Sequence, residues 1–344
     1  MSLDIVDPIL HRGWDDVLVS SPDSSVFHSS GWARVLSGSY GYIPRYFASF
    51  QAGKIFALLP VMEVNSLLTG RRGISLPFSD YCDPLVPAGI PLESLMAQII
   101  DHAGSSGWQT LEIRCRNGRL KGTLPSSTYY GHILPLTGSE EQVFSRFRES
   151  TKRNIRNAIQ EGVTVSISRS PESLAQYYRL HCLTRTEHGL PPQPFRFFRN
   201  IHRHMLSEGL GFTVLASFAG TVIAGSLYLH LGDRAYYKYG ASDRNFRHLR
   251  ANNLMMWEAI RWFARNGYKT FCFGRTEEEN EGLRQFKKGW GTNEEHLHYY
   301  KYDLTQKDYV TDRLLIFGFH NKVFRKMPVF LSRIAGSLMY RHMA

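Results

Sequence analysis

A stripe of basic side chains is the first feature of this chain whose spacing suggests chemistry. Arg148, Lys152 and Arg156 recur every four residues, and apolar residues between 144 and 158 recur at three- and four-residue spacings. This pattern predicts one long helix starting near Gly138, with a packed face and a separate cationic face. The cationic face either grips phosphates or is simply a solvated helix surface.

A second candidate is Arg275, which follows an apolar stretch that ends at Phe273. Because sites in α/β folds gather beyond the carboxyl ends of buried strands, this guanidinium is placed to bind a phosphate or a carboxylate. The structural alternative is an ion pair with Glu277 or Glu278.

Aromatic residues dominate the stretch 234–242, which we expect to be a strand. Alternation along a strand predicts that Tyr237 and Tyr239 share one face, where they either line an acceptor channel or belong to the core. Lys238 lies between them and is a further candidate for binding substrate.

The sequence offers little for covalent or metal catalysis. It has no Gly-x-Ser-x-Gly motif, and its four cysteines are far apart and predicted to be buried thiols. His202-x-His204 and His296-x-His298 place pairs of imidazoles at alternate positions, but neither pair has a third ligand at a persuasive spacing. We therefore expect no metal site.

Composition indicates a globular protein with a polyanionic partner. The 344 residues are 43% hydrophobic, and 41 basic against 30 acidic residues give a formal charge of +11. This charge favours RNA, nucleotide-linked sugars or an acidic lipid surface without choosing among them. No apolar run approaches the roughly 18 residues of a membrane span, and the first thirty residues lack signal-peptide anatomy, so we expect a cytoplasmic protein.

Two segments near the front of the chain have echoes, in the same order, further on. Residues 48–57 resemble 216–224 and predict a hairpin around an Ala-Gly turn, while 107–113 resemble 267–273 and predict a buried strand entered through Gly-aromatic-polar-Thr. A helix-period stretch precedes the buried strand each time. The pattern predicts a duplicated domain rather than a solenoid.

The predicted organisation has three parts: an N-terminal domain over residues 1–137, a C-terminal domain over 138–304 and a tail over 305–344. The tail carries seven basic and two acidic residues among many apolar ones, with a break at Pro328. It reads as an amphipathic helix pair for an anionic membrane surface, and equally as a segment that docks on protein.

The hairpin, helix and strand order is that of the acetyltransferase (GNAT) fold, and its doubling resembles the Fem-type peptidyltransferases. The closest resemblance is to FemAB-like proteins associated with exopolysaccharide and PEP-CTERM/exosortase systems. It covers roughly residues 25–303 and rests on these segments: Phe27-His28-Ser29-Ser30-Gly31-Trp32, Leu76-Pro77-Phe78-Ser79-Asp80-Tyr81, Tyr237-Lys238-Tyr239-Gly240-Ala241-Ser242, residues 252–262, Phe273-Gly274-Arg275-Thr276 and Gly282-Leu283-Arg284-Gln285-Phe286-Lys287-Lys288-Gly289-Trp290-Gly291. The implied fold class is α+β, with two tandem GNAT-like domains whose mixed sheets are flanked by helices.

The resemblance implies transfer of an acyl or aminoacyl group to an amine of a cell-envelope or polysaccharide precursor, without a metal or a covalent enzyme intermediate. Lys287, in Phe-Lys-x-x-Trp-Gly, matches the family lysine that stabilises charge near the transferred group. Lys288 is included as a substrate-binding candidate. The alternative for Lys287 is a surface lysine beside Lys288.

Two departures from the family bear on catalysis. Cys272 stands where many relatives carry an acid, and Glu112, at the equivalent repeat position, is the replacement candidate for a catalytic carboxylate. Acetyl-CoA users also carry a glycine-containing Arg/Gln-x-x-Gly-x-Gly/Ala turn at a helix start, because glycine lets backbone approach phosphate. Here residues 247–252 contain no glycine.

The donor suggested by that turn and by the basic charge is aminoacyl-tRNA rather than acetyl-CoA, with no tightly bound cofactor. The expected acceptor is a nucleotide- or lipid-linked sugar precursor. The competing hypothesis is a non-catalytic GNAT-fold adaptor that binds RNA or a polysaccharide precursor.

Overall fold

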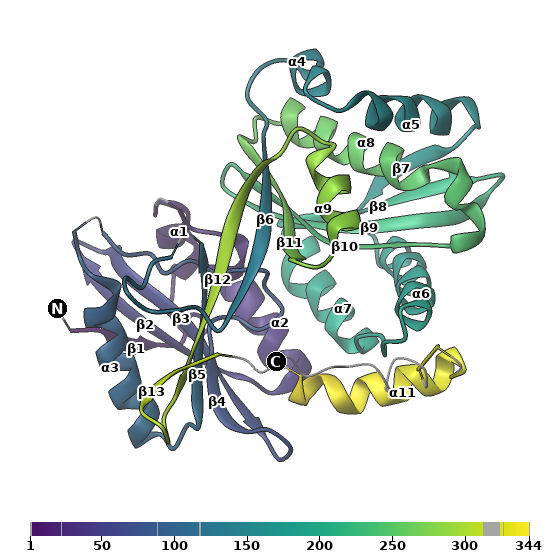
Figure 1. Cartoon of the computed structure of the whole chain (residues 1–344). Coiled ribbons are helices and arrows are strands. Elements are labelled where there is room, and N and C mark those ends of the chain that lie inside the picture. The colour runs from purple at the N-terminus through teal and green to yellow at the C-terminus, as the bar shows by residue number, and fades with distance from the viewer. Residues whose placement is uncertain are drawn as a thin grey trace. The chain divides into compact units, whose positions relative to one another are not determined.

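The computed structural model describes residues 2–21, 23–87, 89–116, 118–311, 324–325 and 327–343. The chain forms two compact units (Figure 1). Unit 1 comprises residues 1–130, 295–314 and 340–344, and unit 2 comprises 131–294 and 315–339. The predicted organisation is sequential, whereas in the structure the chain returns to unit 1 within a strand, at residue 295.

Unit 1 is a mixed sheet covered by helices. Its strands lie in the order β1-β2-β3-β4-β5-β12, with β13 beside β12, and only the β4–β5 pair among these is parallel. Its elements are β1 (Asp4–Val6), α1 (Trp14–Val19), η1 (Val26–His28), α2 (Ser30–Tyr40), β2 (Ile43–Gln51), β3 (Lys54–Ser66), β4 (Gly70–Ile74), α3 (Leu92–Ser105), β5 (Thr110–Arg116), most of β12 (Asn293–Asp303), β13 (Asp308–Val310) and η4 (Tyr340–His342).

Unit 2 repeats this plan with more helices. Its strand order is β6-β11-β10-β9-β8-β7, with β10 and β11 parallel. Its elements are the end of β6 (Ser127–Pro135), α4 (Glu140–Ser145), α5 (Glu149–Gln160), β7 (Thr164–Ser168), α6 (Pro171–Glu187), α7 (Phe195–Ile201), η2 (His202–Leu206), β8 (Gly211–Phe218), β9 (Thr221–Leu231), β10 (Arg234–Ser242), η3 (Arg244–Leu249), α8 (Ala251–Arg265), β11 (Thr270–Glu277), α9 (Glu281–Lys288) and α11 (Val329–Met339).

The predicted hairpins are confirmed in both units. Ala52 and Ala219 have the same φ of 47°, and the glycines that follow them have φ of 73° and 75°. Two consecutive residues with positive φ form a two-residue turn whose backbone twist matches the right-handed twist of the two strands that it joins. Each hairpin also has a register shift just before the turn, between Ser49 and Phe50 in one and between Ala216 and Ser217 in the other.

The second repeated segment is confirmed in the same detail. Trp108 N donates to Ala103 O and Tyr268 N donates to Phe263 O, so both helices end in the same way. The strands that follow begin at Thr110 and Thr270 and pair in parallel with β4 and β10. The duplication predicted from the sequence is therefore present down to individual backbone hydrogen bonds.

The long helix predicted from residue 138 is wrong in one respect. The structure has two helices, α4 and α5, separated at residues 146–148, and Arg148 N donates to Gly289 O instead of continuing a helix. The apolar face is as expected, because Phe147, Ile155 and Ala158 are buried in the unit 2 core. A tertiary contact, which no local pattern shows, divides the helix.

The tail is described only in part. Residues 312–323 and 326 lie outside the described residues, so the predicted helix pair is observed only as α11 and the short η4. Among the described residues, no helix has the length and apolarity needed to cross a bilayer.

Candidate functional site

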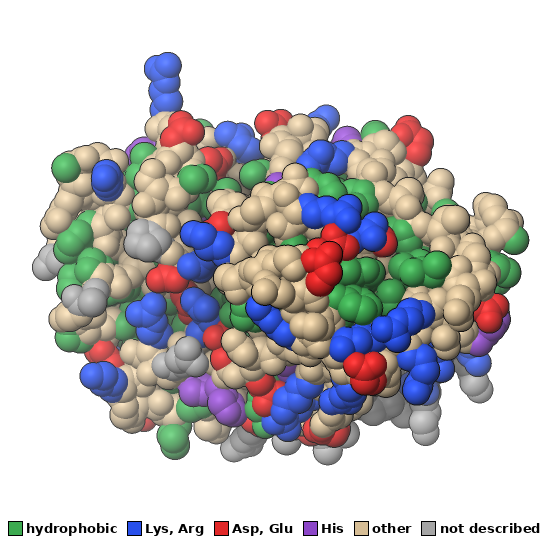
Figure 2. All heavy atoms as spheres, turned by 90° about the horizontal axis from the view of Figure 1, so that it is seen from above, with side chains coloured by type: hydrophobic (Ala, Val, Ile, Leu, Met, Phe, Trp, Pro, Cys, Tyr) green, Lys and Arg blue, Asp and Glu red, His purple; other side chains and the backbone are tan. Residues whose placement is uncertain are grey.

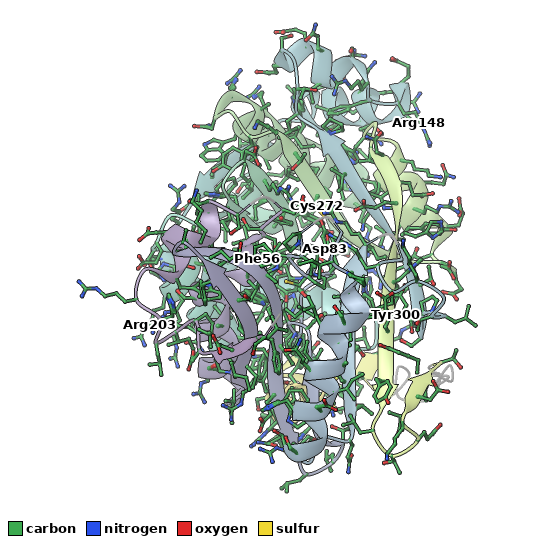
Figure 3. All side chains as sticks on the ribbon, turned by 90° about the vertical axis from the view of Figure 1, so that its left-hand side faces the viewer. Phe56, Asp83, Arg148, Arg203, Cys272 and Tyr300 are labelled. Carbon is green, nitrogen blue, oxygen red and sulfur yellow. The ribbon has the colours of Figure 1, made fainter. Side chains whose placement is uncertain are left out.

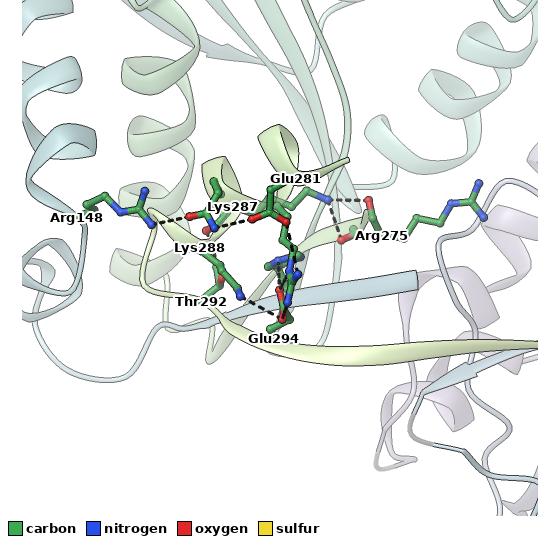
Figure 4. Close-up of polar contacts among 11 residues, drawn as sticks. Arg148, Arg275, Glu281, Lys287, Lys288, Thr292 and Glu294 are labelled. Atoms are coloured by element: carbon green, nitrogen blue, oxygen red, sulfur yellow. Dashed lines mark hydrogen bonds and ion pairs between the residues drawn. The ribbon is translucent and has the colours of Figure 1, made fainter. Parts of the chain in front are cut away.

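Lys287 is a buried cation at the end of α9. Its side chain is 3% exposed, and its Nζ donates to Gly274 O at 3.0 Å and to Arg275 O at 2.7 Å (Figure 4). Gly274 has φ of 71°, a conformation that favours glycine, and its carbonyl accepts from the ammonium. Lys287 is therefore not a surface lysine, and two carbonyl oxygens hold its charge against β11.

His132 on β6 is a neighbour of this cation that the sequence analysis did not identify. Its side chain is fully buried, and its Nε2 lies 3.2 Å from Oε2 of Glu294. Burial, followed by the positive charge of Lys287, lowers the pKa of His132 to about 4. The imidazole is thus neutral at pH 7. No strand was predicted at this position, and the only signal was a histidine within the aromatic and apolar stretch 128–136, where a histidine is usually a core residue.

Glu294 forms ion pairs with the other basic side chains near the end of α9. It accepts from Arg284 at 2.8 and 2.7 Å and lies 3.3 Å from Lys288 Nζ. Hydrogen bonds from Arg284 are the main reason that the pKa of Glu294 is lowered to about 2. Lys288 is therefore paired with a carboxylate at the base of α9, which weighs against a primary role in binding substrate.

Arg275 forms the predicted structural ion pair, but a long one. Its Nη2 lies 3.8 Å from Glu277 Oε1, and both side chains are about a third exposed or more. Exposed pairs of this kind contribute little stability, typically below ~1 kcal/mol. The pair does not prevent Arg275 from binding an anion at the end of β11.

Tyr237 and Tyr239 do not share a strand face, so that prediction is wrong. The pairing of β10 with β9 shifts between them, a bulge that turns the later side chain over. Tyr237 packs with Tyr228 in the core that includes α8, whereas Tyr239 contacts Phe198 of α7. Lys238 Nζ lies 4.9 Å from the Tyr239 ring centre.

The basic stripe on α5 is divided among different partners. Arg148 precedes the helix and donates to Gln285 Oε1 at 3.1 Å, Lys152 bonds Glu149 at 2.8 Å, and Arg156 is exposed. Figure 2 views the molecule from above, the side on which α4 and α5 lie in Figure 1, and its Lys and Arg side chains are interspersed with Asp and Glu. The three side chains of the stripe therefore differ in their partners and in their exposure.

Glu112 in unit 1 and Cys272 in unit 2 occupy equivalent positions, as predicted. Glu112 pairs with Ile74 across β4–β5, and Cys272 pairs with Tyr236 across β10–β11, each two residues after the strand's first threonine. Glu112 accepts from Arg114 Nε at 2.6 Å. Cys272 is buried and lies among interior side chains in Figure 3, whereas Arg148 lies near the outer edge.

A hollow of about 210 Å³ lies at the start of α8, lined in part by Arg247, Arg250 and Asn252. Arg250 has φ of 56°, the left-handed conformation that glycine adopts most easily. The left-handed turn therefore forms without glycine. The arginine instead adds a cationic side chain to the hollow.

The remaining candidates from the sequence are the cysteines and the histidine pairs. All four cysteines are free and buried, as expected. Among the described residues, no group of three or more His, Cys, Asp or Glu side chains is arranged to hold a metal ion.

Comparison with known proteins identifies the domain that carries Lys287. The acetyltransferase (GNAT) domain family matches residues 145–288, which lie within unit 2. Unit 2 has a GNAT-like fold. Its buried lysine is close to the end of the matched stretch, in the helix that comes directly after β11.

Curated relatives match a shorter part of the chain. The lipid II:glycine glycyltransferases of Staphylococcus haemolyticus and Staphylococcus aureus are each 35% identical over 79 residues. That stretch is 21% of this chain and 19% of the relatives, so the chain spans about a fifth of the length of the proteins it matches.

Solved structures extend the likeness to both units. The crystal structure of FemX has a TM-score of 0.69 and 17% identity, covering 89% of this chain and 98% of its own. A tandem GNAT protein from the clavulanic acid biosynthesis pathway has a TM-score of 0.53 and 10% identity, covering 88% and 98%. The predicted fold class and the Fem-type resemblance are confirmed, whereas the association with PEP-CTERM systems stays a prediction.

Proposed function

We propose that this protein is an acyl- or aminoacyltransferase that forms an amide on an amine of a cell-envelope precursor by direct transfer. The observation that carries the proposal is the buried ammonium of Lys287, held by two carbonyls beside β11 of a GNAT-like domain. A fixed positive charge in a site shielded from water stabilises a developing oxyanion far better than a solvated one.

In the proposed reaction the acceptor amine attacks the acyl carbon. The new bond joins nitrogen to that carbon, and the bond from carbon to the donor's ester oxygen breaks. Lys287 stabilises the negative charge that builds on the carbonyl oxygen, while Arg275 binds an anionic group of one substrate. The amine must also lose a proton, for which Glu112 is the proposed acceptor, and the departing ester oxygen takes up a proton and leaves as the hydroxyl of the donor.

The proposal for Glu112 rests on its place in the repeat. It lies in unit 1 at the position where unit 2 has Cys272. Its carboxylate accepts a hydrogen bond from Arg114 Nε, and a carboxylate is a common general base.

The finer proposal concerns substrates. The acceptor is a lipid- or nucleotide-linked sugar precursor, by analogy with the glycyltransferases that are 35% identical to this chain over 79 residues. An exopolysaccharide precursor is the more specific hypothesis. The donor is aminoacyl-tRNA, which the net charge of +11 supports. An acyl-CoA is the alternative, because Arg247 and Arg250 line a hollow at the helix start where its phosphates would bind.

The test compares Lys287→Met with Lys269→Met, a matched change of an exposed lysine in the same unit that pairs with Asp233. Wild type is supplied with mixed aminoacyl-tRNAs or acyl-CoAs and lipid II or UDP-linked muropeptide, and products are identified by mass. We expect a mass increment with tRNA donors, a loss of at least ~10²-fold in kcat for Lys287→Met, and no change for Lys269→Met. Equal turnover of the two variants would contradict the role of Lys287.

The adaptor hypothesis remains the second candidate because Cys272 replaces the family acid. It predicts no turnover with any donor, together with precursor or RNA binding that survives Lys287→Met. Thermal unfolding of the variant is the control, since removing the ammonium takes a charged hydrogen-bond donor away from the Gly274 and Arg275 carbonyls, at a cost of about 1–3 kcal/mol.

A further inference from the structure

Helix α11 docks on unit 2 through its small residues. Ser332 and Gly336 are buried, and α11 packs against α6 (Figure 1). A Cβ atom on Gly336 would overlap the carbonyl oxygen of Pro192, so the backbones approach too closely for any larger residue. Arg333 stacks over the Tyr178 ring of α6 at 5.4 Å.

The large apolar residues of α11 face the other way. Phe330, Leu331, Ile334 and Leu338 are 62%, 42%, 54% and 65% exposed. At 100° per residue these positions form one stripe opposite Ser332 and Gly336. A helix that served only to cover unit 2 would turn this stripe inward, because burying such side chains is the main gain from packing. The exposed stripe indicates a further partner.

Charge identifies the kind of partner. The described residues of unit 2 from Phe324 to Met339 include Arg325 and Arg333 and no acidic residue. A surface that combines exposed apolar residues with arginines and has no acidic residue is suited to an anionic bilayer. The apolar face enters the boundary between headgroups and acyl chains, and the arginines bind lipid phosphates. With 11 residues α11 is too short to span a bilayer.

We propose that α11 lies flat on an anionic lipid membrane, with Phe330, Ile334 and Leu338 inserted. This surface is independent of the proposed transferase chemistry, since it shares no residue with the site around Lys287.

The experiment is flotation of the full-length protein with vesicles of phosphatidylcholine alone or with 30% phosphatidylglycerol. The test variant is Phe330→Ser with Ile334→Ser. The matched control is Leu124→Ser with Ile159→Ser, two apolar residues that are 78% and 57% exposed elsewhere. All the altered side chains are exposed, and unchanged thermal unfolding of both variants checks that the fold is retained.

We expect wild type and control to float with the anionic vesicles and to float at least tenfold less with the neutral ones. The test variant should lose at least tenfold in binding to the anionic vesicles. Absence of wild-type flotation, or equal flotation of both variants, overturns the proposal. A wild-type dimer that the test variant alone dissociates, with flotation unchanged, also overturns it and assigns the stripe to a second copy of the chain.

Discussion

Units 1 and 2 share a scaffold but differ in the segment that comes directly after their central parallel strand. After β11 the chain of unit 2 forms α9, which supplies Lys287 and the cluster around Glu294. After β5 the described residues of unit 1 form no helix before β6. The duplicated fold is thus the common framework, and one added helix gives one copy its buried cation. This difference predicts that electrostatic catalysis resides in unit 2.

The largest expected effect is a loss of kcat in a variant of unit 1, which tests whether that unit contributes to catalysis. Glu112→Gln keeps the shape of the side chain but removes its capacity to take a proton, so kcat should fall by about 10²- to 10⁴-fold while KM changes little. Steady-state kinetics with the product-mass assay measures this. Glu161→Gln, on the exposed turn after α5, is the control. Unchanged kcat in Glu112→Gln would confine the chemistry to unit 2.

A second prediction concerns the buried His181 of unit 2. Burial lowers the pKa of His181 to about 3, below its ordinary value of 6.5. At pH 7 both the folded and unfolded forms are neutral, but as pH falls from 6.5 to 4 only the unfolded chain takes up the proton. This site alone should then remove about 3 kcal/mol of stability between those two pH values.

Urea unfolding at several pH values tests this with His181→Phe, whose stability should fall less steeply on acidification than that of wild type. The exposed His296→Gln change in unit 1 is the control and should leave the slope unaltered. Parallel pH profiles for His181→Phe and wild type would show that the acid sensitivity arises elsewhere.

The smallest effect tests a packing difference between the repeats. Gly73 in β4 and Ala235 in β10 are equivalent, but a Cβ on Gly73 would overlap the Trp108 ring. Gly73→Ala should therefore destabilise unit 1 by about 1–3 kcal/mol through overpacking. Trp108→Tyr, which copies Tyr268 of unit 2, should restore part of that loss in the double variant. Additive losses in the double variant would argue against this contact.

Short sequence motifs were sufficient to predict much of the repeated structure and the family resemblance. The Ala-Gly turns at 52–53 and 219–220 and the Gly-aromatic-polar-Thr entries at 107 and 267 have strong conformational preferences, so their structures follow from a few residues. The burial of Lys287 was not predictable in this way, since an amphipathic segment with two adjacent lysines is equally consistent with a solvated face.

Three features depended on contacts between distant residues. A backbone hydrogen bond from Arg148 N to Gly289 O divides the predicted long helix. A bulge in β10 places Tyr237 and Tyr239 on opposite faces of the strand. The place of His132 beside Lys287 arises because β6 and α9 converge on Glu294 from opposite ends of the domain's sequence.

The sequence by itself determined the duplication, the fold class and the presence of a basic, apolar tail, because turn chemistry and hydrophobic period act between near neighbours. Tertiary structure decided which cation is buried against carbonyl oxygens, which cations pair with carboxylates and which face of α11 stays exposed. Those outcomes depend on side chains that meet only after strands far apart in the chain have paired, and no local pattern records them.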